Sequence, residues 1–228
     1  MLISLFQAQL PFFQFMAILL AYLAVLLISF SCHEFAHAFS AYKNGDPTAK
    51  LYGRMTLNPF AHINVYGFIC LIIFGFGWAD PVPVNEYNYR RGKRSMFAVA
   101  ISGIFANLCL ALLFTFIYAL IGTVAPQAFN GYTFFSQWLS YFLIYGVEIN
   151  ICLAFFNLLP FYPLDGSRLL ELVLKPNNRF LQFMYKYSTL ILLMLLLFGV
   201  INFLLQYVLY FMEVGMLTMW TSLFSLFT

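Results

Sequence analysis

Two histidines and a glutamate near the end of the first apolar run have the types and spacing of a hydrolytic metal site. The run contains His33, Glu34 and His37 in the pattern His-Glu-x-x-His. Residues four apart lie on one face of an α-helix, offset by about 40°, so both imidazoles can reach one metal ion. Glu34 directly follows the first histidine and can reach a water that the metal activates. The pattern therefore predicts a zinc ion that polarises a carbonyl and acidifies water, with Glu34 as the general base.

The composition predicts that this site lies inside a membrane. Of the 228 residues, 63% are hydrophobic and only 8% are charged, which leaves too little polar surface for a soluble domain of this size. We expect an all-α polytopic membrane protein with about 5–6 membrane helices. An ionisable group in a membrane helix is costly and therefore indicates function. The net charge of +3 gives no reason to expect a nucleic-acid partner.

Apolar runs and their breaks predict the elements that position the histidines. The first helix should extend from about Pro11 to Tyr42 and end at Asn44-Gly45-Asp46-Pro47, where Gly and Pro stop it. It lacks the basic start and small-residue cleavage site of a signal peptide, so we expect it to be retained. The remaining predictions are membrane helices over residues 95–122, 134–158 and 180–210, a short amphipathic helix over 167–175 and an apolar tail over 214–228.

Residues 63–78 form an apolar run that is shorter than the ~20 residues a spanning helix needs. Residues 48–62 before it are polar and are expected to be extended. Pro81-Val82-Pro83-Val84 after it alternates in a pattern typical of an edge strand. We expect a small re-entrant or β-like element embedded in the membrane.

The distribution of positive charge predicts the orientation. If residues 63–78 do not cross the membrane, all eleven Lys and Arg lie on one side and the uncharged connector 123–133 lies on the other. The positive-inside rule then places the charged side in the cytoplasm. The histidines at the end of the first helix are therefore expected near the cytoplasmic face.

A hydrolytic zinc site needs a third protein ligand and an open position for water. The candidates in the sequence are His62, Asp46, Asp80, Glu148 and Asp165. His62 is expected to be an ordinary loop residue, and Asp46 to lie exposed in the turn after the first helix. Asp165 lies in a Pro-flanked break at the expected membrane depth of the two histidines, where only a cation would partner its carboxylate. Asp165 is therefore the predicted third ligand.

Three polar or small residues of the later helices have mainly structural interpretations. Gly103 and Asn107, four apart, are expected to mark helix packing, with Asn107 a candidate polar lining residue. Glu148 is expected to be hydrogen-bonded inside the bundle.

The two halves of the predicted site together resemble a known family. His33-Glu34-x-x-His37, followed by Asn157-x-x-Pro160-x-x-Pro163-Leu164-Asp165-Gly166, is similar to the motifs of the site-2 protease family of intramembrane zinc metalloproteases. Residues 53–59 and 77–85 also resemble segments of its short prokaryotic members. Where many members read Asp-Gly-Gly-Arg, this chain reads Asp165-Gly166-Ser167-Arg168, a change expected to alter loop detail and not ligation.

The resemblance implies a set of residue roles. One zinc ion per chain would be held by His33, His37 and Asp165, with Glu34 as the catalytic base. Asn157 matches a family position that helps to hold the substrate carbonyl or its oxyanion, although capping the end of its own helix explains it equally well.

The extended segment near residue 82 would bind substrate. In the family a membrane-embedded sheet has an unpaired edge, and the residues that match it are Pro81, Val82 and Pro83. An unwound substrate could add to such an edge as a strand.

The resemblance also implies an organisation and a class of substrate. Residues 1–228 would form a single membrane-embedded metalloprotease domain without a PDZ or CBS regulatory domain, with a catalytic core over about 15–175 and C-terminal membrane helices over 180–228. Its substrates would be transmembrane proteins or peptides in the lipid bilayer of a prokaryotic cell membrane. They would be cleaved in regulated intramembrane proteolysis or in the removal of signal-peptide remnants.

Other functions share the first motif. A prenyl-protein-type membrane metalloprotease has the same zinc-binding helix but does not predict the Pro-x-x-Pro-Leu-Asp-Gly break. Fatty-acid desaturases need many histidines, and three are too few. The alternative from another class is a metal-binding membrane transporter or a non-catalytic membrane adaptor, and zinc flux into liposomes would favour transport.

Overall fold

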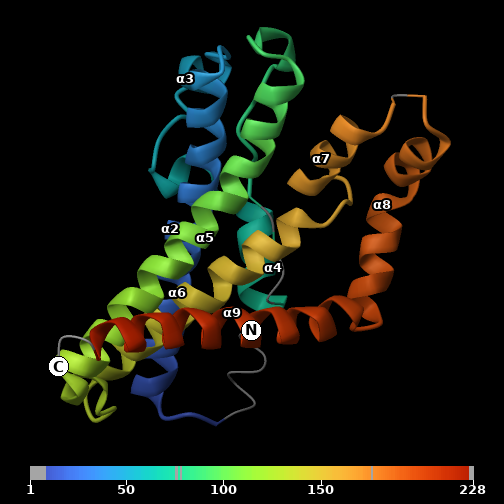
Figure 1. Ribbon diagram of the computed structural model, residues 1–228. Helices are drawn as coiled ribbons and strands as arrows, with labels where there is room; N and C mark the ends of the chain where they lie inside the picture. The colour runs from blue at the N-terminus through green and yellow to red at the C-terminus, as the bar shows by residue number, and fades with distance from the viewer. Residues whose placement is uncertain (1–8, 75–76, 78, 176, 226–228) are drawn as a thin grey trace.

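The computed structural model describes residues 9–74, 77, 79–175 and 177–225, and these residues fold almost entirely as helices (Figure 1). The α-helices are α2 (Phe12–Lys43), α3 (Thr48–Leu51), α4 (Val65–Phe74), α5 (Lys93–Val124), α6 (Phe134–Leu158), α7 (Asp165–Val173), α8 (Arg179–Leu197) and α9 (Val200–Phe224). Short 3-10 turns are η1 (Pro59–Ala61), η2 (Glu86–Asn88) and η3 (Pro126–Phe129). Within the described ranges there is no strand. The predicted all-α class is confirmed.

Among the described residues, five helices are long and apolar enough to cross a membrane, namely α2, α5, α6, α8 and α9. This number lies within the predicted range. The ends of α2, α5 and α6 fall within two residues of the predicted ones. At the end of α2 the backbone of Gly45 has φ +106°, a conformation that only glycine adopts easily, so the helix stops where the sequence predicts.

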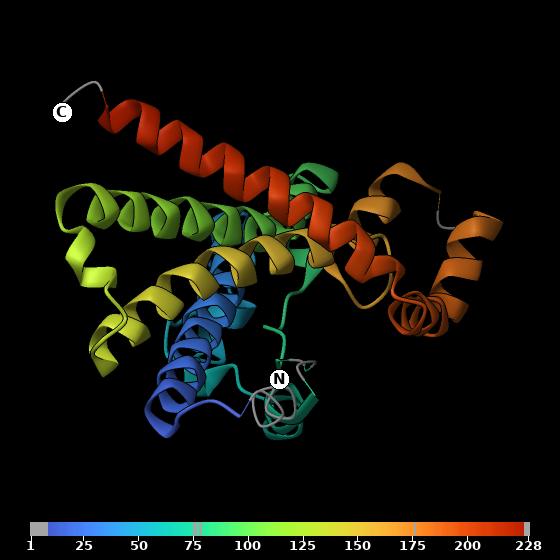
Figure 2. The same cartoon turned by 90° about the horizontal axis from the view of Figure 1, so that it is seen from below.

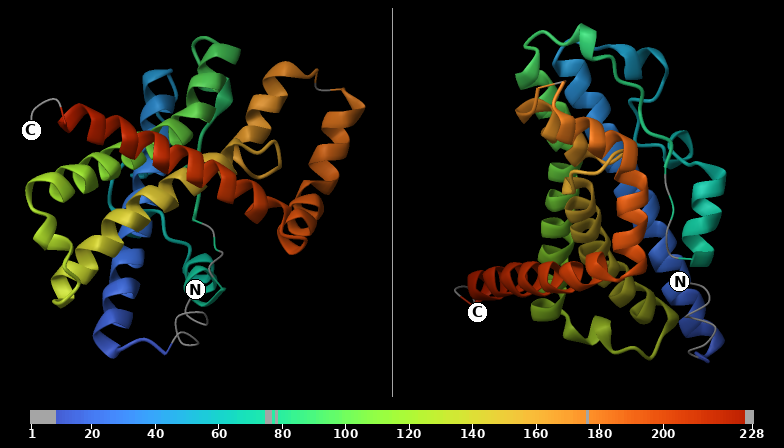
Figure 3. Two further views of the ribbon diagram at one scale, coloured as in Figure 1. Left: turned by 60° about the horizontal axis from the view of Figure 1, so that its bottom comes forward. Right: turned by 90° about the vertical axis from the view of Figure 1, so that its right-hand side faces the viewer.

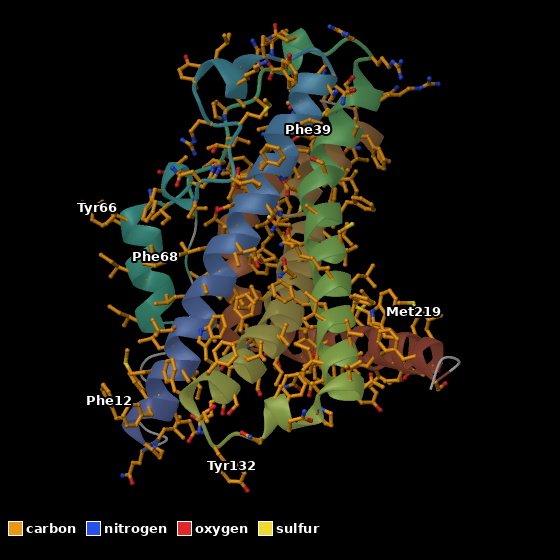
Figure 4. All side chains as sticks on the ribbon, turned by 90° about the vertical axis from the view of Figure 1, so that its left-hand side faces the viewer. Phe12, Phe39, Tyr66, Phe68, Tyr132 and Met219 are labelled. Atoms are coloured by element: carbon orange, nitrogen blue, oxygen red, sulfur yellow. The ribbon has the colours of Figure 1, made fainter. Side chains whose placement is uncertain are left out.

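The helices α2, α5 and α6 pack against one another and form the part of the molecule that holds the site. Small residues permit this close approach. A side chain at Gly146 of α6 would meet the ring of Phe114 on α5 at 2.3 Å. Ala17, Ala21 and Ala38 of α2 are likewise fully buried. Figure 4 shows Phe39 toward the end of α2 that joins the polar loops and Tyr132 at the opposite end of the bundle.

The segment between α2 and α5 leaves and returns at the same end of the bundle (Figure 3). Its two arms are joined, because the backbone N–H of Asp80 donates to the carbonyl oxygen of His62 at 2.9 Å and an antiparallel bridge links Ile63 to Ala79. α4, which lies between these arms in the sequence, is only ten residues long. The two ends of the segment thus meet, as a re-entrant element requires, and the β character of its described residues is limited to this bridge and an extended segment over residues 80–85.

Residues 48–62 are not extended as predicted. α3 and η1 occupy much of this stretch, and Asn58 caps η1 by accepting a hydrogen bond from the N–H of Phe60. The prediction was wrong because short helical turns of one or two hydrogen bonds have no apolar periodicity to reveal them.

The C-terminal part differs from its prediction. The single helix expected over 180–210 is broken at Gly199, which has φ +70°, and α9 continues to Phe224 through most of the expected tail. Figure 2 shows α9 running across α5 and α6. There Met216 joins a buried cluster with residues of α5 and α6 such as Phe114 and Leu143. Residues 226–228 of the expected tail lie outside the described residues.

Candidate metal centre

The three residues of the first motif lie on one buried face of α2. His33, Glu34 and His37 are all buried. The Nε2 atoms of the two histidines are 3.1 Å apart, with the rings edge to face. The four-residue spacing therefore places both imidazoles at one point, as predicted.

The break after α6 brings Asp165 to the same point. Its Oδ2 lies 3.2 Å from Nε2 of His33 and 3.0 Å from Nε2 of His37. Asp165 begins α7, and the next residue, Gly166, packs directly on the end of α6. A Cβ at Gly166 would meet the carbonyl oxygen of Leu158 at 2.3 Å. Glycine is thus required at this position for the carboxylate to reach the histidines.

The donor set fits a bound zinc ion. Zinc bonds of about 2.0–2.1 Å in a tetrahedron place ligand atoms about 3.3 Å apart. The three atoms here are separated by 3.0–3.2 Å. Because Nδ1 of each ring faces an oxygen acceptor, each neutral ring has its lone pair on Nε2, and three lone-pair donors converge. A cation is what such a convergence requires.

Both histidines are oriented from behind by α5. Nδ1 of His37 donates to the backbone carbonyl of Val99 at 2.8 Å, and Nδ1 of His33 lies 2.6 Å from Oδ1 of Asn107. Between these two contacts lies Gly103. A Cβ there would be 2.4 Å from Nε2 of His37 and 2.6 Å from Cε1 of His33. α5 therefore approaches the imidazoles as closely as a backbone can.

Glu34 faces the extended segment that follows α4. One carboxylate oxygen, Oε2, accepts a hydrogen bond of 2.8 Å from the backbone N–H of Val82. Val82 itself is buried against Ala38 and Ala49. Arg54 holds the start of the segment by donating to the carbonyl oxygen of Asp80 at 2.7 Å. Glu34 is thus held next to the candidate metal ligands and against the segment predicted to bind substrate.

A cavity of about 390 Å³ opens in front of these residues. It is bounded by the metal-ligand face of α2, by the extended segment and by the break between α6 and α7. Its lining residues are Phe30, His33, Glu34, His37, Gly77, Ala79, Pro81, Val82, Val84, Val99, Ala100, Leu153, Phe156, Asn157, Pro163, Leu164, Asp165 and Arg168. Most of this wall is apolar, and its few polar groups gather at the predicted site.

The predicted substrate-binding residues have different positions relative to the cavity. Pro81 and Val82 line it, whereas Pro83 is not among the described lining residues. Asn157 also lines it, and its amide nitrogen donates to the carbonyl oxygen of Leu153 at 3.0 Å within α6. That bond leaves the role of Asn157 a prediction, because the side chain both faces the cavity and bonds to its own helix.

The other candidate ligands lie elsewhere. His62 is buried, and its Nε2 contacts the carbonyl oxygen of Thr56 at 2.9 Å. Asp80 accepts a hydrogen bond from the amide of Asn64 at 2.9 Å. Glu148 borders a separate cavity of about 120 Å³ between α5, α6 and α9, together with Glu213. Within the described residues, His33, His37 and Asp165 form the one such cluster that could hold a metal ion.

The expectation that Asp46 is exposed was wrong. It is fully buried, and its carboxylate accepts hydrogen bonds from the N–H of Asn85 at 2.7 Å, from the amide of Asn88 at 2.8 Å and from Thr48. Burial raises the pKa of this carboxyl group, but the hydrogen bonds outweigh burial and hold the pKa below its ordinary value. Asp46 is therefore a structural acceptor that ties the loop after α2 to the end of the extended segment.

Sequence reasoning selected the three side chains that the structure brings together, but not how the histidines are oriented. It treated Gly103 as a helix-packing residue and Asn107 as a polar lining residue, whereas both contact His33. Asn150 was missed entirely, although it is fully buried and bonded to Asn107. The available signal was an amide within a membrane helix, which needs a partner.

Comparisons with known proteins agree with this arrangement. The family described as peptidase family M50 matches residues 21–198. YwhC of Bacillus subtilis, provisionally named a zinc metalloprotease, is 40% identical over 162 residues, which cover 71% of this chain and 73% of YwhC. No solved structure matches the chain.

Two further relatives carry the same provisional name and match over smaller shares of their length. Rip2 of Mycolicibacterium smegmatis is 28% identical over 171 residues, covering 72% of this chain and 61% of Rip2. MJ0611 of Methanocaldococcus jannaschii is 31% identical over 107 residues, covering 47% of this chain and 50% of MJ0611.

Proposed function

The chain belongs to peptidase family M50, the site-2 protease family, and on that premise we propose that it is a zinc endopeptidase that cleaves transmembrane segments of other membrane proteins. We assign this activity to a single membrane-embedded domain whose catalytic core spans about residues 15–175. Zinc, one ion per chain, would be held by His33, His37 and Asp165.

One observation carries the proposal. Three lone-pair donors converge at 3.0–3.2 Å beside the buried carboxylate of Glu34, at the wall of a mainly apolar cavity. Three protein ligands beside a cavity are the arrangement of a catalytic zinc site. A structural zinc site would have four protein ligands and no space for water.

The chemistry follows from the positions of the side chains. When bound, zinc supplies Lewis acidity that polarises the substrate carbonyl and makes water more acidic. Glu34 would accept the proton of the attacking water and pass it to the leaving amine. The backbone N–H of Val82 holds one oxygen of Glu34, which orients the carboxylate so that its second oxygen would meet the water.

Asn157 is the group we propose for the developing oxyanion. Its amide lines the cavity on the wall that carries Asp165. A side-chain N–H in a dry site stabilises negative charge that develops on the carbonyl oxygen. The amide nitrogen of Asn157 has two N–H donors, and the bond to the carbonyl oxygen of Leu153 uses one of them, which leaves the other for this role.

The extended segment over residues 80–85 is the proposed substrate edge. No strand pairs with it among the described residues, and Pro81 and Val82 border the cavity. A transmembrane helix shields its own carbonyls by hydrogen bonding, so it must unwind before attack, and pairing with an edge compensates for those lost bonds. Pro83 is proposed to help hold the substrate from the same segment.

The proposed location is a prokaryotic cell membrane, with the site toward the cytoplasmic face. The support is the contact between the two arms around His62 and Asp80, which leaves the polar loops between α2 and α5 and their Lys and Arg at one end of the bundle. The proposed role is regulated intramembrane proteolysis or the removal of signal-peptide remnants.

The position at which a model substrate is cleaved tests the proposal. Purified protein in detergent is incubated with a model single-span membrane protein, and the products are analysed by mass spectrometry. We expect cleavage within the apolar span, faster when a Gly-Pro pair in the span favours unwinding. Cleavage confined to the polar flanks would contradict it. Cleavage within the span that continues in the presence of a metal chelator would show that zinc is not required.

A further inference from the structure

Behind His33 lies a chain of fully buried amides that connects α2, α5 and α6. Nδ1 of His33 lies 2.6 Å from Oδ1 of Asn107 on α5. Nδ2 of Asn107 donates to Oδ1 of Asn150 on α6 at 2.8 Å. Nδ2 of Asn150 donates to Oγ of Ser29 on α2 at 2.9 Å and to the backbone carbonyl of Gly146 at 2.8 Å.

The far end of this chain has a fixed direction. A backbone carbonyl can only accept a hydrogen bond, so the group that Asn150 turns toward Gly146 must be its NH₂. The carbonyl oxygen of Asn150 then faces Asn107 and can only accept. Asn107 must therefore present its NH₂ to Asn150 and its own oxygen to His33.

The near end of the chain is then determined. Facing an oxygen that cannot donate, Nδ1 of His33 must hold the ring proton, and Nε2 must hold the lone pair. Nε2 is the atom directed at Asp165 and His37. His37 has a simpler arrangement, because its Nδ1 faces the backbone carbonyl of Val99 directly.

We propose that Asn107 and Asn150 are positioning residues that fix the tautomer and orientation of His33, so that Nε2 is ready to bind the metal. The direction is set by the carbonyl of Gly146 and transmitted through both amides. This relay, the chain of hydrogen bonds from Gly146 through Asn150 and Asn107 to His33, rests on the proposed zinc role of His33. It also explains why two amides that are 0% exposed occur within membrane helices.

Because both amides are buried, the other orientations of their side chains are costly. If either amide were flipped, two acceptors or two donors would face each other, and a buried polar group left without a partner costs about 1–3 kcal/mol. Groups that orient a metal-binding histidine in this way change metal affinity by about 10–100-fold when they are removed.

The experiment compares Asn107→Leu, Asn150→Leu and the double variant. Zinc affinity is measured by competition with a chromophoric chelator, and geometry by the visible absorption of cobalt-loaded protein. We expect a loss of up to about 100-fold for Asn107→Leu and about tenfold for Asn150→Leu. The double variant should lose no more than Asn107→Leu alone, because Asn150 acts only through Asn107.

A second readout needs neither zinc nor catalysis. The chain has three histidines, so metal-free protein labelled with ¹⁵N in the histidine rings gives few signals, and the signal of His33 is assigned by its loss in His33→Gln. We expect the Nδ1–H form of His33 in the parent protein and a mixture of tautomers in Asn150→Leu. The matched control is Thr115→Val, which removes another buried polar group of α5 that bonds to Ala111 of its own helix.

The outcomes separate the relay from the proposed function. A fold-loss of zinc affinity in the double variant that equals the product of the two single fold-losses, or an unchanged His33 tautomer in Asn150→Leu, overturns the relay even if the parent protein cleaves substrate. A tautomer that responds in a protein that cleaves nothing supports the relay and contradicts the proposed function. If Asn150→Leu does not fold, Asn150→Ala removes the same donor without added bulk.

Discussion

Gly103 shows how strictly single residues define the site. A Cβ at this position would lie 2.4 Å from Nε2 of His37, well inside van der Waals contact. The two rings would have to turn away from the point where Asp165 meets them. Such crowding at buried positions is relieved only by movement of the neighbours.

We therefore expect Gly103→Ala to lower zinc affinity at least tenfold, with no large change in helix content. Gly122→Ala on the same helix is the matched control, because the nearest atom to its Cβ is 4.0 Å away. Zinc content after dialysis against a weak chelator is the measurement. Equal zinc content in the two variants would contradict the close approach of α5.

Asp165 as the third ligand can be tested against Asp80, another candidate in the sequence. Asp165→Asn keeps the shape of the side chain but removes the charge that faces His33 and His37, so we expect zinc binding to weaken by about tenfold or more. Asp80→Asn should retain zinc, since Asp80 bonds to Asn64 and lies outside the cluster. Zinc retained by Asp165→Asn and lost by Asp80→Asn would reverse the assignment.

At the residue scale, sequence reasoning was most successful where the chemistry is local. His33, Glu34 and His37 are fixed by helical spacing, and Asp165 by the cost of an unpartnered carboxylate in a membrane. Asn150 and the burial of Asp46 could not be predicted. Their partners lie far away in the sequence, 121 residues for Asn150 with Ser29 and 39 for Asp46 with Asn85.

At the scale of elements, the extended segment over residues 80–85 depends on the loop that anchors it. Asp46 accepts from Asn85 and Asn88 at one end, and Arg54 donates to Asp80 at the other. Between these anchors Val82 meets Glu34. The segment is thus held in place by side chains and not by a sheet.

We expect Asp46→Asn to loosen this segment, because an amide has one acceptor oxygen where the carboxylate uses two. Lost bonds to a buried charge cost about 1–3 kcal/mol of stability. Limited proteolysis of residues 44–90 at neutral pH should be faster in the variant, while the helices α5 and α6 remain protected. Identical proteolysis rates would show that Asp46 does not anchor the segment.

The lowered pKa of Asp46 predicts how the stability of the protein depends on pH. The pKa of Asp46 is lowered in the folded protein, so its contribution is fully present above the ordinary pKa of about 3.9. It is lost as the pH falls from that value through the lower folded pKa. The difference in stability between parent and Asp46→Asn should therefore be constant from pH 6 to 8 and shrink below about pH 4. A difference that shrinks between pH 6 and 8 would point to another group.

Long helices were predicted well because twenty or more apolar residues leave few alternatives. The break at Gly199 was missed for the same reason. Apolar residues flank it on both sides, so composition gives no boundary, and a lone glycine is tolerated inside a helix. The turn at Gly199 is thus not visible from composition.

At the scale of the whole molecule, the side on which each loop lies depends on whether the segment between α2 and α5 crosses the membrane. Because Asp80 and His62 are bonded at the base of the hairpin, the chain enters α5 from the end at which α2 finishes. The connector between α5 and α6 then lies at the far end (Figure 4). The distribution of Lys and Arg predicts that this segment does not cross the membrane, and that stays a prediction.

Cysteine labelling in closed vesicles tests the path. In a protein lacking its four native cysteines, Lys43→Cys and Lys93→Cys should react with a membrane-impermeant reagent from the same side. Tyr132→Cys, which replaces a side chain 91% exposed in the far connector, should react only from the other side. Labelling of positions 43 and 93 from opposite sides would mean that residues 63–78 cross the membrane.

The most direct test of the central claim is the behaviour of Glu34→Gln beside the parent protein. Both are purified in detergent, analysed for zinc and incubated with a single-span substrate. We predict about one zinc per chain in both, with cleavage by the parent and a loss of at least 100-fold in the variant, since Glu34 moves the proton but does not hold the metal. Undiminished cleavage by Glu34→Gln would contradict the mechanism. Zinc without any cleavage by the parent, together with zinc flux into liposomes, would identify a transporter.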